Sequence, residues 1–276
     1  MTYPRSVTSP DRPRIRHPWR LLGILAVAGV AVGAVAIGRP WTSAPVVAAA
    51  DGREPVAAAA PAPLALPAHP HVLVFGDSWT WGAAADVPTD GYAYLIGRDL
   101  GWKTTVDGVR GSGYLKHGFL EPGVDGGTFG ERIARLDPAL DPDLVIIEGS
   151  INDRREPEAG YRGAVTRAWN ALAALYPKAS VVVMGPAPQI LPVEAGTARI
   201  DRDLSALAAH RGWWYVSPVE QHWITTENWP WVIDAAANNH PSTRGHEYLA
   251  EKLTEALQAM GDRKVIADAP HTDLEP

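Results

Sequence analysis

The fold of this chain is constrained most by three short, almost wholly apolar runs, at His71–Phe75 (HVLVF), Leu144–Glu148 (LVIIE) and Ser180–Met184 (SVVVM). Strands without polar alternation are buried on both faces, as they are in a parallel sheet that helices cover from both sides. Lys103–Val109 and Trp213–Val216 also have a strand-like composition. The sequence therefore predicts a five-stranded parallel sheet.

Segments with helical spacing separate these strands. We expect helices over Tyr92–Leu100, Phe129–Leu136, Glu158–Tyr176, Glu194–His210 and Ser242–Met260. Right-handed crossovers then give an α/β fold, a three-layer α/β/α sandwich of the flavodoxin-like kind. In such folds the functional site lies at the carboxyl ends of the strands. Candidate residues are therefore sought just after each strand and in the loop before the last helix.

The beginning of the chain has a different character. Residues 21–38 (LLGILAVAGVAVGAVAIG) carry no charge, and a helix of that length spans about 27 Å, enough for a bilayer core. Arginines precede this run, which predicts that the basic residues 1–20 stay in the cytoplasm and that the body lies outside. The run is either a secretory signal cleaved near Ala48–Ala50 or a single membrane anchor, and its length favours the anchor.

The body of the protein is expected over residues 71–261. Residues 39–70 are rich in Ala and Pro and predict an extended tether, and residues 262–276 read as a polar tail. The chain has no cysteine, which excludes disulfides, a thiolate nucleophile and cysteine metal sites. A net charge of -6 argues against a nucleic-acid partner. The sequence does not predict an oligomeric state.

The turn after the first strand reads GDSWTWG, from Gly76 to Gly82. A serine at a strand-to-helix turn presents its hydroxyl at the edge of the sheet. Its N–H lies near a helix N-terminus, where developing negative charge is stabilised. The alternative is structural, because Asp77 and Ser78 are also common helix-capping residues.

Three other turns at the same edge carry residues of interest. Gly111 follows the second strand, Asn152 follows the third, and His240 precedes the last helix, in which His246 is expected to pack. Each has a plain structural alternative, such as a tight turn or an Asn-Asp turn. Each signal is weak alone, but four of them in order at one sheet edge favour a functional site.

Together these segments resemble the SGNH hydrolase superfamily, also called GDSL-type esterases and lipases. The first block, GDSxTxG, is matched throughout, and the resemblance covers residues 71–260. It assigns the nucleophile to Ser78, the second-block glycine to Gly111, the third-block asparagine to Asn152 and the last-block histidine to His240. Ser150 departs from the family pattern, because it replaces the glycine of GxND.

The resemblance implies the SGNH hydrolase fold and acyl transfer through a serine ester, without a metal or cofactor. His240 would take the proton as the Ser78 hydroxyl attacks an ester carbonyl. The N–H groups of Ser78 and Gly111 and the side-chain amide of Asn152 would hold the oxyanion. Water would then release the acyl group.

The family's acid lies three residues before the histidine, where this chain has Ala237. Asp234 could reach His240 if the loop curls back. A backbone carbonyl near Ala237 could instead accept the imidazole N–H, or the site could be a weak dyad or inactive. We favour the carbonyl, which orients a histidine but stabilises the imidazolium less than a carboxylate does.

Other acidic and aromatic side chains lie near these turns. Asp77 and Asp153 are interpreted as helix caps, and Glu148, which ends a buried strand, requires a partner. Tryptophans accompany both the serine and the loop before the histidine, and they could either bind sugar rings or acyl chains or pack that loop. They are Trp79, Trp81, Trp223, Trp229 and Trp231.

The sequence therefore predicts an extracytoplasmic serine esterase, secreted or anchored to the membrane by its N-terminal helix. Its substrate would be a small-molecule or glycan ester with an acetyl or other short acyl group. One alternative is an O-acyltransferase domain for an envelope polysaccharide, served by a membrane acyl donor. Another is a non-catalytic glycan-binding protein that has kept the fold.

Overall fold

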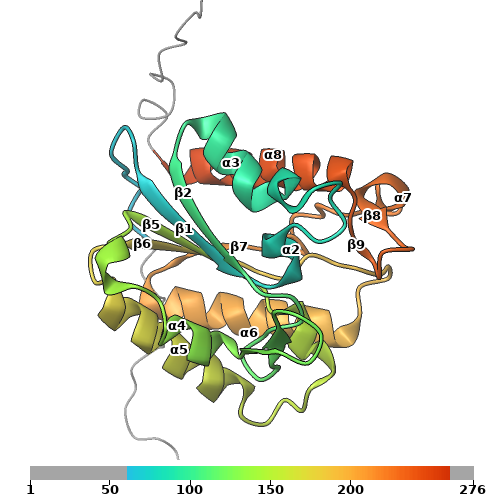
Figure 1. The fold of residues 1–276 in the computed structure, drawn as a ribbon, viewed down its shortest axis with the longest axis horizontal. Coiled ribbons are helices and arrows are strands. Elements are labelled where there is room, and N and C mark those ends of the chain that lie inside the picture. The colour runs from blue at the N-terminus through green and yellow to red at the C-terminus, as the bar shows by residue number, and fades with distance from the viewer. Residues whose placement is uncertain (1–60, 262–276) are drawn as a thin grey trace, which may run out of the picture. The chain divides into compact units, whose positions relative to one another are not determined.

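The computed structural model describes residues 61–261 (Figure 1). The predicted signal or anchor at 21–38, the basic segment 1–20, the first part of the predicted tether and the tail at 262–276 lie outside the described residues. None of the helices between residues 61 and 261 combines the length and apolar character needed to cross a bilayer.

A five-stranded parallel sheet forms the centre of the described chain, as predicted. Its strands are β1 (His71–Gly76), β2 (Lys103–Gly108), β5 (Leu144–Glu148), β6 (Ser180–Met184) and β7 (Trp214–Val216), in the spatial order β2-β1-β5-β6-β7. β1 pairs with β2 through His71 and Lys103 and with β5 through Val72 and Leu144. The carboxyl ends of these three neighbouring strands therefore lie together.

Helices cover both faces of the sheet, which confirms the three-layer α/β/α architecture (Figure 1). One face carries α3 (Tyr92–Leu100) and α8 (Thr243–Met260). The other carries α4 (Phe129–Ile133), α5 (Tyr161–Leu175) and α6 (Ala195–Arg211). Because successive strand residues point to opposite faces, each apolar strand serves two cores at once.

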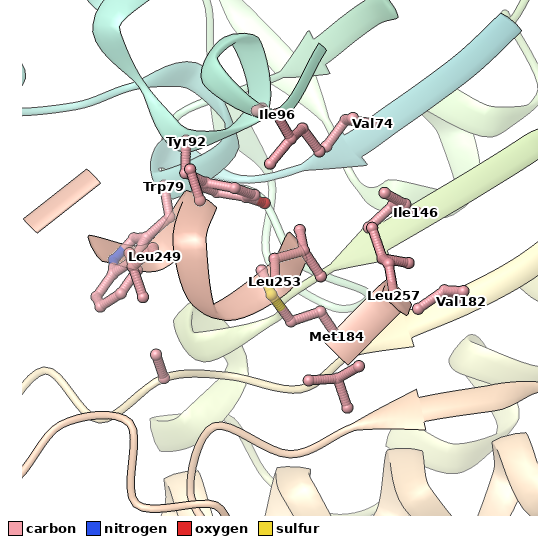
Figure 2. Packing of buried hydrophobic residues seen from close by; sticks show 14 of the residues in the cluster. Val74, Trp79, Tyr92, Ile96, Ile146, Val182, Met184, Leu249, Leu253 and Leu257 are labelled. Carbon is pink, nitrogen blue, oxygen red and sulfur yellow. The ribbon is translucent and has the colours of Figure 1, made fainter. Parts of the chain in front are cut away.

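Figure 2 shows the core between the sheet and the helices α3 and α8. Val74 and Ile146 of the strands pack with Ile96 of α3 and with Leu253 and Leu257 of α8. All five side chains are buried, and fully burying such a side chain contributes roughly 1.5–3 kcal/mol before entropy is counted. This packing fixes the sheet edge from which the site is built.

Helix boundaries differ from the predictions by a few residues. α5 begins at Tyr161 instead of Glu158, because Gly160 adopts a left-handed conformation (φ 87°) that ends the preceding turn. α4 ends at Ile133 instead of Leu136.

Several elements were too short to show a periodic pattern. They are α2 (Ser78–Trp81), β3 (Gly118–Phe119), β4 (Asp125–Gly127), α7 (Trp229–Val232), β8 (Ile233–Asp234), β9 (His240–Pro241) and the 3₁₀ turns Pro88–Asp90, Pro138–Leu140 and Ile151–Arg155.

The predicted tether over 39–70 is too long, because its last residues belong to the body. Leu64 is buried, and its N–H donates to the carbonyl of Met260 at 2.8 Å. The indole of Trp214 donates to the carbonyl of Ala62 at 3.0 Å. Leu64 and Leu66 interrupt the Ala/Pro composition and pack against the core that contains α8, which explains the earlier start.

Candidate active site

The turn between β1 and α2 holds Ser78 at the carboxyl edge of the sheet. Asp77 caps α2, since its carboxylate accepts the N–H of Trp79 at 3.0 Å, as predicted for a capping role. A Cβ atom at Gly76 would overlap the side chains of Thr80 and Glu148. The tight turn therefore requires glycine before the aspartate, and it leaves Ser78 as the first residue of a helix.

A second small element brings His240 to this serine. β8 and β9 pair as antiparallel strands, with Asp234 opposite His240. The Nε2 atom of His240 lies 2.8 Å from the Oγ of Ser78, and its Nδ1 lies 2.8 Å from the carbonyl oxygen of Ala237. Since a carbonyl only accepts, Nδ1 carries the proton and Nε2 accepts the Ser78 hydroxyl.

Of the three alternatives for the missing acid, the structure shows the second: a backbone carbonyl, that of Ala237, is the partner of the His240 imidazole. Asp234 acts on the loop instead of on the imidazole, because its Oδ1 accepts the N–H groups of Ala236 at 2.8 Å and Ala237 at 3.1 Å. Asn238 and Asn239 both have left-handed conformations, which asparagine tolerates better than most residues. This turn directs the Ala237 carbonyl at the histidine ring.

The surroundings of His240 keep its imidazole neutral. Burial lowers the pKa of His240 below its ordinary value, and the hydrogen bond to Ala237 opposes that shift. A neutral imidazole with a free Nε2 lone pair is the form that can accept a proton from serine. A carbonyl lacks the full negative charge that would stabilise the imidazolium.

Gly111 lies after β2 with φ 76°, a conformation that favours glycine. A Cβ atom there would stand 3.0 Å from the ring of Phe119. Among the hydrogen bonds of residues 61–261, none uses the N–H of Gly111 as donor. That N–H is free to approach a ligand.

Asn152 lies in the 3₁₀ turn after β5, and its side-chain amide is already engaged. Its Nδ2 donates to the carboxylate of Asp77 at 3.1 Å and to the carbonyl of Ser112 at 3.0 Å. Both amide protons therefore have acceptors within the protein. To serve as the predicted third oxyanion donor, Asn152 must share or release one of these bonds.

Two acidic residues beside the site have more specific partners than the sequence indicated. Asp153 caps no helix, contrary to our prediction; it accepts the N–H groups of a loop after β2, from Tyr114, Leu115 and Lys116. The partner that Glu148 requires is the hydroxyl of Thr80, which donates to it at 2.9 Å.

The sequence analysis missed Arg132 of α4, which is buried. Its Nη1 donates to the carbonyl of Gly76 at 2.7 Å and to the hydroxyl of Ser112 at 2.8 Å, and its Nη2 contacts Asp107 at 2.6 Å. It thus joins the ends of β1 and β2. The available signal was its spacing, because Arg132 occupies an apolar-face position between Phe129 and Ile133.

Two of the five tryptophans are buried, and Trp81, Trp229 and Trp231 are half-buried. Trp79 and Trp223 are buried, and Trp79 packs in the core with Leu249 of α8 (Figure 2). Arg110 lies 4.6 Å above the ring of Trp81. The two fully buried indoles therefore pack the protein and are not faces of a substrate pocket.

The site contains the groups needed for nucleophilic acyl substitution: a serine, a neutral histidine and N–H donors at one sheet edge. Across residues 61–261, no three His, Asp or Glu side chains are grouped as ligands for a metal ion.

Comparisons with known proteins agree with this geometry. Residues 74–248 match the GDSL-like Lipase/Acylhydrolase family. A GDSL lipase of Mycobacterium tuberculosis is 34% identical over 141 residues, which cover 49% of this chain and only 58% of that relative. The aryl esterase of M. smegmatis has a TM-score of 0.53 at 19% identity, covering 69% of this chain and 99% of that one. A carbohydrate acetylesterase family member from Sinorhizobium meliloti has a TM-score of 0.52 at 16% identity, covering 69% and 98%.

Proposed function

The chain belongs to the GDSL-like lipase/acylhydrolase family, and from this premise we propose that it is a serine hydrolase of carboxylic esters. Ser78 is the nucleophile and His240 the general base. The observation that carries the proposal is the 2.8 Å contact between Nε2 of His240 and Oγ of Ser78, with the opposite ring nitrogen bound to Ala237.

In the proposed mechanism, the Ser78 Oγ attacks the ester carbonyl while its proton passes to Nε2 of His240. The carbonyl oxygen becomes an oxyanion, held by the N–H groups of Ser78 and Gly111 and by the Asn152 amide, once that amide releases the carbonyl of Ser112. His240 then returns the proton to the leaving alcohol as the ester C–O bond breaks. A water molecule, deprotonated by the same histidine, attacks the acyl-enzyme and releases the carboxylic acid.

The carbonyl of Ala237 replaces part of what a carboxylate does in a triad. It fixes the tautomer, whose loss costs about 10⁴ in kcat in a serine protease. It does not neutralise the imidazolium, so the proposed enzyme should be slower than one with an acid at this position. Hydrolysis of small activated esters is the reaction most tolerant of this deficit, because their leaving groups need little protonation.

We propose acetyl or other short-chain esters of small molecules or glycans as substrates. The support is the names of similar proteins, which include an aryl esterase and a carbohydrate acetylesterase family member. An extracytoplasmic location is proposed from the sequence alone, on the arginines of residues 1–20 and the uncharged run at 21–38. Fractionation of cells that express the full chain would test that location.

The central test labels the full-length protein with a fluorophosphonate and then supplies p-nitrophenyl esters of increasing acyl length. We expect labelling and acetate turnover in the wild type and in Ser205→Ala, a control on α6 that changes another serine. Both should be lost in Ser78→Ala. Labelling with negligible hydrolysis would instead favour acyl transfer to another acceptor, and no labelling of correctly folded protein would contradict the proposal.

A further inference from the structure

Two carboxyl groups are buried directly beneath the proposed nucleophile. Asp77 has no exposed surface, and Glu148 is only 3% exposed. The backbone N–H of Asp77 donates to Oε2 of Glu148 at 3.3 Å, which brings the two acidic residues together. Two neighbouring carboxylates in a low-dielectric interior repel each other, so one proton on the pair is strongly favoured.

Hydrogen-bond donors surround Asp77. Its Oδ1 accepts the N–H of Trp79 at 3.0 Å and its Oδ2 accepts the amide of Asn152 at 3.1 Å. A carboxylate can accept these bonds on both oxygens, whereas a protonated Asp77 would have to place an O–H among donors. The ionised form therefore fits the surroundings of Asp77.

Glu148 has the opposite character. Its Oε2 accepts two hydrogen bonds, one from Thr80 at 2.9 Å and one from the N–H of Asp77. Since Thr80 gives its only hydroxyl proton to Glu148, the Tyr92 hydroxyl, 2.8 Å away, donates to Thr80. Oε2 thus fits the carbonyl oxygen of a neutral acid, and the acid proton is assigned to Oε1.

The surrounding charges do not compensate a second negative charge. Arg132 is the cation that acts on both carboxyl groups, and it is already bonded to Asp107. Asp153 adds negative potential near Asp77, and Tyr92 faces Glu148 as a neutral phenol. Burial and the charge of Asp77 raise the pKa of Glu148 well above its ordinary value, while burial raises the pKa of Asp77 to about 6.

We propose that Glu148 is a neutral acid that donates its proton to the Asp77 carboxylate, and that this pair is the positioning element for the side-chain amide of Asn152. The carboxylate holds the amide beside Ser78 without itself touching the substrate. The positioning role depends on the proposed esterase function, whereas the protonation of Glu148 does not.

The first test compares two replacements of Glu148 in the full-length protein. Glutamine has one acceptor and one donor group in the places of the neutral acid's carbonyl oxygen and hydroxyl, and leucine has a similar volume with neither. We expect kcat/KM for p-nitrophenyl acetate to remain within about threefold of wild type in Glu148→Gln and to fall in Glu148→Leu, as the loss of a buried hydrogen-bonding group predicts. A glutamine variant as impaired as the leucine variant, or unable to fold, would overturn the neutral-acid assignment.

The second test asks whether Asp77 acts through Asn152. Removing an oxyanion donor typically lowers kcat by ~10²–10³, which we expect for Asn152→Ala. Asp77→Asn should lower kcat substantially, and the double variant should lose little more than Asn152→Ala alone, because both changes remove one interaction. Losses that multiply in the double variant would show that Asp77 does not position Asn152.

Infrared spectroscopy gives a readout that does not depend on activity. The C=O stretching band of a protonated buried carboxylic acid should be present near neutral pH in the wild type and in Ser78→Ala, and absent in Glu148→Gln. If the band is present in a protein without esterase activity, the proposed function fails while the neutral acid stands. Absence of the band in active wild-type protein would overturn the inference about Glu148 alone.

Discussion

The two halves of the candidate site are built in different ways. Ser78 lies at a turn fixed by buried side chains, among them its neighbour Thr80 and, from distant parts of the chain, Glu148 and Arg132. His240 lies on a two-residue strand whose loop is held mainly by its own neighbours, through Asp234 and the Ala237 carbonyl. The nucleophile is therefore constrained by the fold, and the base by local backbone geometry.

This difference explains how a site can lose its usual acid and keep its arrangement. A self-contained loop can exchange a carboxylate for a carbonyl without disturbing the core, because few outside contacts depend on it. The same change at Asp77 would remove a helix cap and a partner of Asn152 at once. Variants in the two halves should accordingly separate effects on chemistry from effects on stability.

The largest effect is expected from His240→Ala. Removing the base of a Ser-His pair lowers kcat by on the order of 10⁶ in a well-studied serine protease, and less where the starting activity is lower. Because His240 is half-buried in a local loop, the melting temperature should change little. Ester turnover and thermal melts of the same preparation would measure both, and a folded His240→Ala protein with wild-type turnover would refute the role of the histidine.

A second prediction concerns the helix that follows the histidine loop. His246 of α8 is buried, and its Nε2 donates to the carbonyl of Ala83 while its Nδ1 accepts the N–H of Tyr92. Burial lowers the pKa of His246 to about 4. The unfolded chain binds a proton on this side chain near pH 6.5 and the folded protein does not, so stability falls as the pH drops from about 6.5 towards 4.

The loss of folding stability follows from the lowered pKa of His246 and is on the order of 3 kcal/mol. Chemical denaturation at a series of pH values would measure it. His246→Gln keeps an uncharged donor and acceptor, and it should flatten the pH dependence in this window. An equal acid sensitivity in wild type and His246→Gln would show that other groups are responsible.

A third variant, Gly76→Ala, tests how rigid the nucleophile turn is. The added methyl group would overlap Thr80 and Glu148, and overpacking of this kind typically costs 1–3 kcal/mol, or about 2 kcal/mol here. We expect a lower melting temperature together with reduced turnover. Gly101→Ala gives a contrasting control, since no atom lies within 4 Å of its Cβ position and only the left-handed φ of 66° opposes it.

The smallest effect is expected from Asp234→Asn, because asparagine retains an oxygen that can accept the N–H groups of Ala236 and Ala237. Asp234→Ala removes that acceptor. The loss of these side-chain to backbone hydrogen bonds, worth about 1 kcal/mol, would hold His240 less firmly and lower kcat roughly fivefold. Steady-state kinetics of the Asp234→Asn and Asp234→Ala variants would measure both expected effects. A severe loss in Asp234→Asn would make the negative charge of Asp234 important in itself.

The sequence predicted the regular parts of the fold well. The bounds of β5 and β6 were predicted correctly. An uninterrupted apolar run is favoured where both faces of a strand are buried, as they are in the middle of a parallel sheet. The strand order could not be read, since periodicity indicates which face is buried but not which strands are neighbours. β8 and β9 are two residues each, shorter than any recognisable period.

For the site, motif resemblance indicated which residues to examine, but not how they are supported. Ser78 and His240 are separated by 162 positions, and only the fold brings them together. Arg132 belongs to no conspicuous motif, and the role of Thr80 within its motif was not indicated; both matter through contacts with strand ends far away in sequence. The ambiguity over Ala237 was resolved by backbone direction, which side-chain identity does not encode.

The attachment of Leu64 to Met260 also determines where the described chain begins relative to the active-site edge of the sheet. Met260 ends α8, an 18-residue helix that begins three residues after His240, and such a helix is about 27 Å long. The chain thus enters the body at the far end of α8 from Ser78. A label joined at residue 61 would therefore lie away from the hydroxyl of Ser78 and leave the carboxyl edge of the sheet uncovered.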